Sequence, residues 1–251
     1  MDLAAATRRG IPVIYDGPGG GGDSVAEHVI GLMLCLVKSL ISGHNALVQE
    51  GNYDIRYTLH GTELKGKTLG VVGLGGVGKA LSRKCHFGLE MPILAYDPYV
   101  EDGDAYIQKV SELATVFRKA DFVSIHVPLT PENKKLIGMD HFSLMKKGAH
   151  FINTSRGGVI DEEALCQVLQ EGQIAGAALD VFDPEPPEKD NPLFSMSSVV
   201  VTPHLSGMTE ETLRDTSLNI AAQMLKVLRG EKADFILNPE YVQFHSKRDR
   251  I

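Results

Sequence analysis

The chain has 251 residues, 43% of them hydrophobic and 23% charged, a composition typical of globular proteins and sufficient for one large domain or two small ones. Its formal net charge of −7 argues against a nucleic-acid-binding surface. Because its three cysteines are widely separated and its longest apolar stretch is too short to cross a bilayer, we expect no disulfide framework, no membrane span and a cytoplasmic location.

Short apolar runs alternate with longer stretches of helical periodicity along the chain. The runs contain few polar positions, as is typical of strands that helices cover on both faces. They occupy residues 11–16, 68–74, 92–97, 121–128, 150–155, 174–182 and 198–204. This pattern predicts an α/β fold built on a parallel sheet.

A glycine-rich segment, GPGGGGDS at residues 17–24, precedes the first long helical stretch. Ser24 and Glu27 stand three positions apart and match a capping box, so we expect one long, mostly buried helix over residues 23–50. Residues 51–67 mix polar, glycine and aromatic positions without a period, which predicts a connection or arm.

The strongest local signal is the sequence TLGVVGLGGVGKALSRK at residues 68–84. Gly73, Gly75 and Gly78 have GxGxxG spacing between a predicted strand and a predicted helix. In a dinucleotide site the first glycine permits a tight turn, the second lets the pyrophosphate approach the backbone, and the third lets helix and strand pack closely. A glycine turn that serves packing alone has the same spacing, so the neighbouring residues are needed to distinguish it from a dinucleotide site.

Asp97 favours the dinucleotide site. It ends the next predicted strand, 19 residues after Gly78, where a carboxylate can bind the ribose hydroxyls of adenosine. The same charge would repel a 2′-phosphate, which favours NAD over NADP. A Walker loop is excluded because Ala80 stands where Ser or Thr would hold magnesium. We therefore predict a Rossmann-type doubly wound sheet that binds NAD.

Polar side chains follow three of the later apolar runs. Because the carboxyl ends of parallel strands meet at one edge of a sheet, Arg156, Asp180, Glu185 and His204 are expected to converge beside the cofactor. Arg156 can hold a carboxylate with two parallel hydrogen bonds, and His204 can exchange a proton while Glu185 holds its imidazole. Each residue alone could be an ion pair, a packed histidine or an acidic loop; their joint placement indicates an active site.

The last predicted helix covers residues 209–229, with Thr209 as its cap. Its apolar residues recur at helical spacing and predict a face that needs a partner surface. They are Leu213, Ile220, Met224 and Leu228. The tail after Asn238 becomes charged and is expected to fray.

A series of motifs in uninterrupted order supports a family assignment. They are SVAEH, GVVGLGGVGKAL, AYDP, HVPLTPEN, INTSRGGVIDEEAL, ALDVFDPEPP and VTPHLSGMT. Together they resemble the NAD-dependent D-isomer-specific 2-hydroxyacid dehydrogenases, a family that includes phosphoglycerate dehydrogenase, D-lactate dehydrogenase and hydroxypyruvate or glyoxylate reductases. The resemblance covers residues 2 to 238 and implies an oxidoreductase that transfers a hydride between NAD(H) and a D-2-hydroxy acid/2-oxoacid pair.

The resemblance implies a role for each candidate residue. His204 is the acid/base, Glu185 its carboxylate partner, Arg156 the group that binds the 2-oxoacid, and Asp180 a contact of the nicotinamide carboxamide. No metal is implied. The full set of implied cofactor contacts is Gly73, Gly75, Gly76, Val77, Gly78, Asp97, Val127, Thr154, Ser155, Arg156, Asp180, His204 and Gly207.

The resemblance also implies a domain organisation. Residues 1–22 are expected to be the remnant of a second, flavodoxin-like substrate domain, residues 23–207 the NAD-binding Rossmann domain, and residues 208–251 a helix and tail that return to the substrate domain. Family members carry roughly a hundred further residues before this start, so the chain is expected to be N-terminally truncated. Gly20 to Gly22 then lie in the loop that joins the domains, and a homodimer through the NAD domain is implied.

Two binding-only functions stay open beside the enzyme. The chain could be a truncated product that binds NAD(H) without turnover, or a nucleotide sensor like the corepressors that share this fold and resemble the enzymes at Arg156, Glu185 and His204. The expected partner is a small 2-oxoacid or 2-hydroxy acid, with no nucleic acid and no membrane. The resemblance places most of its pocket in the N-terminal region that is expected to be missing, so hydroxypyruvate, glyoxylate and D-lactate all stay open.

Overall fold

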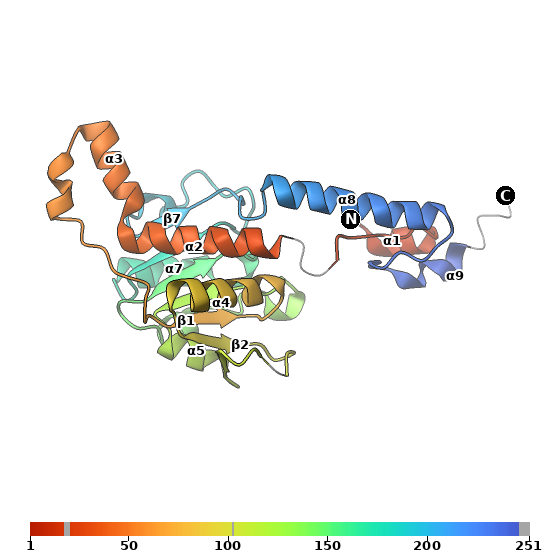
Figure 1. Ribbon diagram of the computed structural model, residues 1–251, viewed down its shortest axis with the longest axis horizontal. Helices are drawn as coiled ribbons and strands as arrows, with labels where there is room; N and C mark the ends of the chain where they lie inside the picture. The colour runs from red at the N-terminus through yellow and green to blue at the C-terminus, as the bar shows by residue number, and fades with distance from the viewer. Residues whose placement is uncertain (18–20, 102, 246–251) are drawn as a thin grey trace. The chain divides into compact units, whose positions relative to one another are not determined.

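The computed structural model describes residues 1–17, 21–101 and 103–245 (Figure 1). The chain divides into two compact units. The larger unit is Gly21–Gly207, and the smaller one combines Met1–Gly20 with Met208–Ile251. The predicted assignment of these parts to an NAD domain and a substrate domain stays a prediction.

The larger unit is built on a seven-stranded, wholly parallel sheet with the order β3-β2-β1-β4-β5-β6-β7. This is the doubly wound order, in which the direction of winding reverses between β1 and β4. The strands are β1 Leu69–Val72, β2 Ile93–Tyr96, β3 Ile107–Lys109, β4 Phe122–Ile125, β5 His150–Asn153, β6 Gly176–Leu179 and β7 Val199–Val201. The predicted Rossmann-type α/β fold is therefore confirmed.

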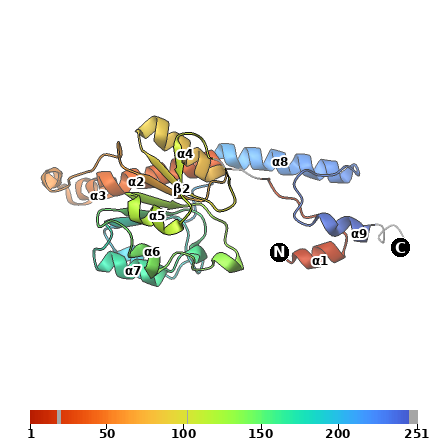
Figure 2. The same ribbon diagram turned by 90° about the horizontal axis from the view of Figure 1, so that it is seen from below.

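Helices cover both faces of this sheet. Figure 2 shows α4 on one face and α5, α6 and α7 on the other. Packing of α2 with α4 on the first face buries one hydrophobic cluster, and the three helices of the second face bury another. The bounds are α2 Gly22–Lys38, α4 Gly76–Leu89, α5 Leu113–Lys119, α6 Met139–Phe142 and α7 Glu162–Gln170. Burial on both faces explains why the strands are apolar throughout.

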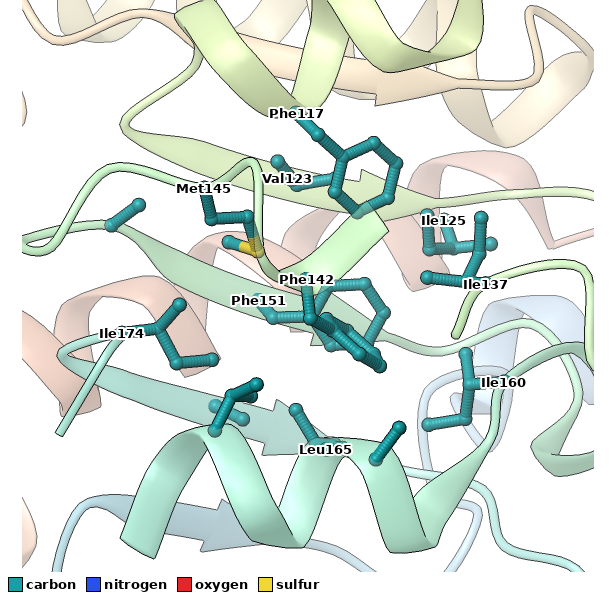
Figure 3. Close-up of a cluster of buried hydrophobic side chains, with 14 of the residues drawn as sticks. Phe117, Val123, Ile125, Ile137, Phe142, Met145, Phe151, Ile160, Leu165 and Ile174 are labelled. Atoms are coloured by element: carbon teal, nitrogen blue, oxygen red, sulfur yellow. The ribbon is translucent and has the colours of Figure 1, made fainter. Parts of the chain in front are cut away.

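The cluster on the second face contains most of the large aromatic side chains of the core (Figure 3). Phe142 of α6 meets Phe151 of β5 edge to face, with ring centroids 5.1 Å apart. Below them α7 contributes Leu165, one of four buried residues that recur at helical spacing along its sheet-facing side. Asp161 starts this helix, because its side chain accepts a hydrogen bond from the backbone N of Glu163 at 3.2 Å.

The register of the sheet aligns the carboxyl ends of five strands. Val72 pairs with Ile125, Ile125 with Asn153, Asn153 with Leu179, and Leu179 with Val201. The loops that follow β1, β4, β5, β6 and β7 therefore leave the sheet along one edge. This edge is where open α/β sheets bind ligands.

The single helix predicted over residues 23–50 is wrong. Two helices, α2 and α3 (Leu40–Glu50), meet at a 65° bend at Ser39, whose φ of 51° is left-handed. The side of α2 that faces the sheet is buried, whereas α3 buries only Ala46. Apolar periodicity continues across Ser39, so the sequence pattern did not reveal the break.

The predicted capping box of Ser24 and Glu27 is also wrong. The residue that caps α2 is Gly21. Ser24 Oγ instead donates to the backbone O of Ser206 at 2.7 Å, and Glu27 Oε1 accepts from Lys84 Nζ at 2.8 Å. Both side chains therefore bond to residues outside α2 and do not cap the helix.

The remaining elements of the larger unit are short. The predicted arm at residues 51–67 contains the 3-10 helix η1 Tyr53–Tyr57, and Figure 1 shows α3 and this segment extending away from the sheet. The edge strand β3 was not predicted, since only Ile107 of its three residues is buried and its pattern is too short to read. Three further 3-10 helices are η2 Pro131–Asn133, η3 Gly157–Val159 and η4 Pro192–Ser195.

The smaller unit contains helices and irregular chain. Its elements are α1 Leu3–Arg8, α8 Glu210–Leu228, η5 Pro239–Tyr241 and α9 Val242–His245. The strand predicted at residues 11–16 is wrong: within the described residues this segment forms one antiparallel bridge, between Ile14 and Ile236. The buried side chain of Asn238 holds the segment instead, accepting from Val13 N at 2.7 Å and donating to Ile11 O at 2.9 Å.

Helix α8 begins as predicted, because Thr209 Oγ1 accepts a hydrogen bond from Thr212 N at 3.2 Å. The apolar side chains of α8 are largely exposed, among them Leu213 at 51% and Leu228 at 79%. Of the glycines expected to lie in the loop that joins the domains, Gly20 lies outside the described residues and Gly21 has a φ of 73°. The expectation is wrong for Gly22, which is the first residue of α2.

Among the described residues, no helix taken singly is long and apolar enough to cross a membrane. The bent pair α2 and α3 passes on length and composition only when the two are counted together.

Candidate active site

The glycine turn after β1 has the geometry that its spacing predicts. Gly73 has a φ of 97°, in the left-handed region that favours glycine. A Cβ on Gly78 would lie 2.0 Å from the carbonyl O of Gly73, so only glycine lets α4 start this close to the strand. A Cβ on Gly75, by contrast, would meet no heavy atom of the described chain within 4 Å. The turn is therefore open where a ligand would approach, and Gly76 and Val77 place the first backbone amides of α4 beside it.

Replacing Gly75 with alanine is expected to leave the fold intact and to weaken NADH binding at least about tenfold, a loss of roughly 1.4 kcal/mol. The added methyl group has room in the free protein but occupies the space where the pyrophosphate would contact the backbone. Fluorescence titration with NADH and an unfolding curve measure the two effects. The matched variant Gly78→Ala should instead lose stability; equal NADH affinity in wild type and Gly75→Ala would contradict the placement.

Asp97 is held beside this turn by backbone amides. Its Oδ2 accepts from Leu74 N and its Oδ1 from Tyr99 N, both at 2.8 Å. The side chain stays partly exposed and lines a pocket of about 360 Å³ at the end of β2, with Tyr96 and Val110 among its walls. A fixed carboxylate next to an open pocket is the arrangement that adenosine-ribose binding requires.

The loop after β5 is shaped by Asn153, which the sequence analysis did not single out. Its Oδ1 accepts from both the backbone N and the Oγ of Ser155, at 3.0 and 2.8 Å, and its Nδ2 donates to Arg156 O at 3.0 Å. Thr154 is 5% exposed, and its Oγ1 has no hydrogen-bond partner within the described part of the chain. A buried hydroxyl without a partner costs roughly 1–3 kcal/mol, so Thr154 Oγ1 is available to a bound ligand or an ordered water. Val127, after β4, lies half-buried between the two groups of loops, since β4 separates β1 from β5.

Close backbone packing joins the loop of Arg156 to the loop of Glu185. A Cβ on Gly157 would lie 1.9 Å from the carbonyl C of Phe182 and 2.6 Å from the N of Asp183. The Arg156 side chain is exposed, and its Nη1 donates to the backbone O of Ser155 at 2.6 Å. The two loops are thus brought together, with the Arg156 guanidinium turned toward its own loop.

His204 and Glu185 form a direct pair. His204 Nδ1 lies 2.9 Å from Glu185 Oε1, and the two side chains are 44% and 40% exposed. An ionised carboxylate only accepts hydrogen bonds, so the proton of this bond lies on Nδ1 and Nε2 is the ring atom left to exchange a proton with a ligand. A pocket of about 580 Å³ adjoins the pair, with mostly apolar walls that include Phe182, Pro187 and Phe194.

Asp180 builds the turn that presents His204, a role the sequence analysis missed. The Asp180 side chain is fully buried. Its Oδ1 accepts from Thr202 Oγ1 at 2.6 Å and from Leu205 N at 2.8 Å, and its Oδ2 accepts from Ser206 N at 2.9 Å. The backbone O of Asp180 also accepts from His204 N at 2.9 Å. These bonds stabilise His204 at a φ of 55°, a left-handed conformation that costs a non-glycine residue about 1–3 kcal/mol.

Burial alone would raise the pKa of Asp180, but the hydrogen bonds from Thr202, Ser206 and Leu205 outweigh it and lower the pKa below its ordinary value of 3.8. A carboxyl with a lowered folded-state pKa stabilises the fold above its unfolded pKa, and this contribution disappears as pH falls through the folded pKa.

Replacing Asp180 with asparagine is therefore expected to lower the free energy of unfolding by about 3 kcal/mol at neutral pH. The amide keeps the size but turns a donor toward amides that need an acceptor. The difference from wild type should shrink as pH falls below about 4, the ordinary pKa of an unfolded Asp, toward the lower pKa of folded Asp180. Urea unfolding of both proteins at neutral pH and near pH 3 measures it. If the two proteins differ by the same free energy of unfolding at neutral pH and near pH 3, the ionised carboxylate of Asp180 does not stabilise the fold.

Glu162 is a second supporting residue that sequence reasoning missed. One of its carboxylate oxygens accepts from Asp183 N at 2.9 Å and the other from Asn191 Nδ2 at 3.2 Å, so it holds both ends of the loop that carries Glu185. Burial raises the pKa of Glu162.

The last predicted contact, Gly207, faces open space among the described residues. Asn153 could have been found from the sequence, because it is a polar residue at the end of an apolar strand. The sequence around Glu162 contains no comparable signal for its role.

Comparison with known proteins identifies the relatives of this chain. The family model described as D-isomer specific 2-hydroxyacid dehydrogenase, NAD binding domain, matches residues 30–206. A D-3-phosphoglycerate dehydrogenase of Methanocaldococcus jannaschii is 42% identical over 242 residues, which are 95% of this chain and 45% of that protein. A glyoxylate reductase of Thermofilum pendens is 39% identical over 251 residues, covering 97% of this chain and 73% of that protein. The chain thus spans less than half the length of the first of these relatives.

The fold also matches a solved structure with bound cofactor. A D-isomer specific 2-hydroxyacid dehydrogenase of Lactobacillus delbrueckii subspecies bulgaricus, solved in its NAD-complexed form, superposes with a TM-score of 0.80 at 28% identity. The match covers 91% of this chain and 73% of that one. The region that the family model matches, residues 30–206, contains both the glycine turn and the His204–Glu185 pair.

Proposed function

The chain belongs to the D-isomer specific 2-hydroxyacid dehydrogenase family and carries its NAD-binding domain, and on this premise we propose that it transfers a hydride between NAD(H) and a D-2-hydroxy acid/2-oxoacid pair. The observation that carries the proposal is the 2.9 Å pair of His204 and Glu185, set on the same sheet edge as the open glycine turn. A proton donor beside a dinucleotide site is what carbonyl reduction needs.

The residues of the sheet edge fit NAD. Gly75 leaves room for the pyrophosphate, Asp97 offers a fixed carboxylate for the ribose, and Thr154 Oγ1 is a buried hydroxyl that needs a partner. The carboxylate of Asp97 favours NAD over a cofactor with a 2′-phosphate. When bound, NADH supplies the two electrons of the reduction as a hydride to carbon 2 of the oxoacid.

The side chains of this chain supply the proton and the orientation. His204 Nε2 would give its proton to the carbonyl oxygen of the 2-oxoacid, so that hydride and proton together yield the 2-hydroxy acid; in the reverse direction Nε2 takes the proton back. Glu185 holds Nδ1 and stabilises the imidazole when it is charged. Arg156 would swing from its own loop to bind the substrate carboxylate with its planar guanidinium.

The experiment is NADH oxidation, followed by the loss of its absorbance, with glyoxylate, hydroxypyruvate, pyruvate and phosphohydroxypyruvate offered in turn. Turnover with any of them supports the proposal and names the substrate. If none is reduced while NADH fluorescence shows binding, the enzyme proposal fails for this chain. That result would favour the NAD(H)-binding functions without turnover, a truncated product or a nucleotide sensor.

We further propose that the smaller unit belongs to the substrate domain and that the active form is a homodimer through the NAD domain, in the cytoplasm. The segment formed by α3 and η1 supports the dimer. Its side chains Val48, Tyr53 and Tyr57 are 67%, 62% and 65% exposed, and the Arg56 guanidinium lies 4.5 Å from both tyrosine ring centroids. Such an apolar and cationic surface is typical of a protein contact. Sedimentation of the purified protein measures its mass.

A further inference from the structure

Two side chains of α2 contact the turn that presents His204. Ser24 Oγ donates to Ser206 O at 2.7 Å. One helical turn later, His28 Nε2 lies 3.0 Å from Thr202 Oγ1 and 3.6 Å from Asp180 Oδ1. The helix therefore touches the chain on both sides of His204, at Thr202 and at Ser206.

The number of available protons fixes which atoms donate in the hydrogen bonds that join His28, Thr202 and Asp180. Asp180 is ionised near neutral pH and can only accept. The single hydroxyl proton of Thr202 goes to Asp180 Oδ1, at 2.6 Å. Thr202 Oγ1 must then accept its second hydrogen bond, so His28 Nε2 carries a hydrogen and donates it. The chain of donors runs from His28 through Thr202 to Asp180.

We propose that His28 is a positioning residue for the acid/base chemistry of His204, acting through Thr202 and Asp180. The inference rests on the proposed function above. Asp180 Oδ1 receives both the Thr202 hydroxyl and the backbone N of Leu205, so its position decides how the residue after His204 is held. A donor at the far end of the chain polarises the Thr202 hydroxyl and strengthens its bond to the carboxylate. Loss of that donor loosens the strained turn on which His204 stands.

A purely structural role for His28 is the competing explanation. The apolar face of α2 already packs it onto the sheet through Ala26, Val29 and Met33, all fully buried. The His28 side chain is 23% exposed and lies beside polar atoms, so its contribution to apolar burial is small. Its distinguishing property is the donated hydrogen bond, and this is what the test must vary.

The kinetic test compares His28→Leu, which removes the donor, with His28→Gln, whose amide nitrogen can reach the position of Nε2. Leucine should lower kcat by about 10- to 100-fold, as expected when a reacting group is misplaced by a fraction of an ångström to 1 Å, with the Kd for NADH changed less than about twofold. Glutamine should restore most of kcat. Thr202→Val and Thr202→Ser should repeat this pattern, and Glu27→Gln, on the same helix but paired with Lys84, is the control.

The second readout does not depend on turnover. The imidazole nitrogens of His204, whose Nδ1 is bonded to Glu185, and the backbone amides of Leu205 and Ser206 give nuclear magnetic resonance signals in nitrogen-15-labelled protein. These signals should shift or broaden in His28→Leu and return in His28→Gln. Unchanged signals, or equal losses of kcat in both His28 variants, would overturn the inference. If wild type reduces no 2-oxoacid, the proposed function fails, and the signals still decide whether His28 holds this turn.

Discussion

Replacing His204 with glutamine is expected to lower kcat for 2-oxoacid reduction by about 10²- to 10⁴-fold, the range that general acid–base catalysis contributes. Glutamine can keep a hydrogen bond to Glu185, but its amide cannot release and recover a proton near neutral pH. The Kd for NADH should change little, because the glycine turn and Asp97 lie on the other side of β4 in the sheet. Turnover and NADH fluorescence measured on the same preparation separate the two effects.

His60→Gln provides the control, since His60 is exposed on the connection before β1, outside the loops at the carboxyl edge. Glu185→Gln should give a smaller loss than His204→Gln, because it weakens the orientation of the imidazole without removing the proton donor. Unchanged turnover in His204→Gln, with its unfolding midpoint also unchanged, would remove His204 from the mechanism.

Replacing Gly157 with alanine is expected to destabilise the larger unit by at least about 3 kcal/mol. The new Cβ would lie 1.9 Å from the carbonyl C and 2.0 Å from the O of Phe182. These are backbone atoms of the loop after β6 and cannot move as a flexible side chain can. Because the loops of Arg156 and Glu185 meet at this point, forcing them apart should also reduce kcat. Urea unfolding and NADH oxidation measure both losses.

Gly148→Ala is the matched control, as Gly148 lies just before β5 and a Cβ there would meet no described heavy atom within 4 Å. Its stability should change by less than about 0.5 kcal/mol or rise slightly, since alanine restricts the unfolded chain more than glycine does. Similar losses in the two variants would contradict the close backbone packing at position 157, because Gly157 is not among the glycines with a positive φ.

The residues proposed to react were predicted from the sequence, whereas the residues that support their loops were found only in the structure. His204, Glu185 and Arg156 are polar residues after apolar runs, and their spacing alone pointed to one sheet edge. Asn153, Glu162 and Asp180 shape the loops that carry them, through bonds to backbone amides up to 26 residues away along the chain. Such bonds leave no periodic pattern, because each depends on how two distant loops happen to meet.

The sequence by itself determined the parallel sheet, the glycine turn and the family. Strands buried on both faces must be apolar throughout, and a dinucleotide turn needs glycine at fixed positions, so both constraints are local and visible. Only the tertiary structure decided that α2 ends at Lys38, that Ser24 binds Ser206 instead of capping its helix, and that Asp180 holds the turn of His204. The end of α2 is set by the left-handed backbone of Ser39. In the other two cases a polar side chain had several possible hydrogen-bond partners, and the packing of the sheet and helices chose among them.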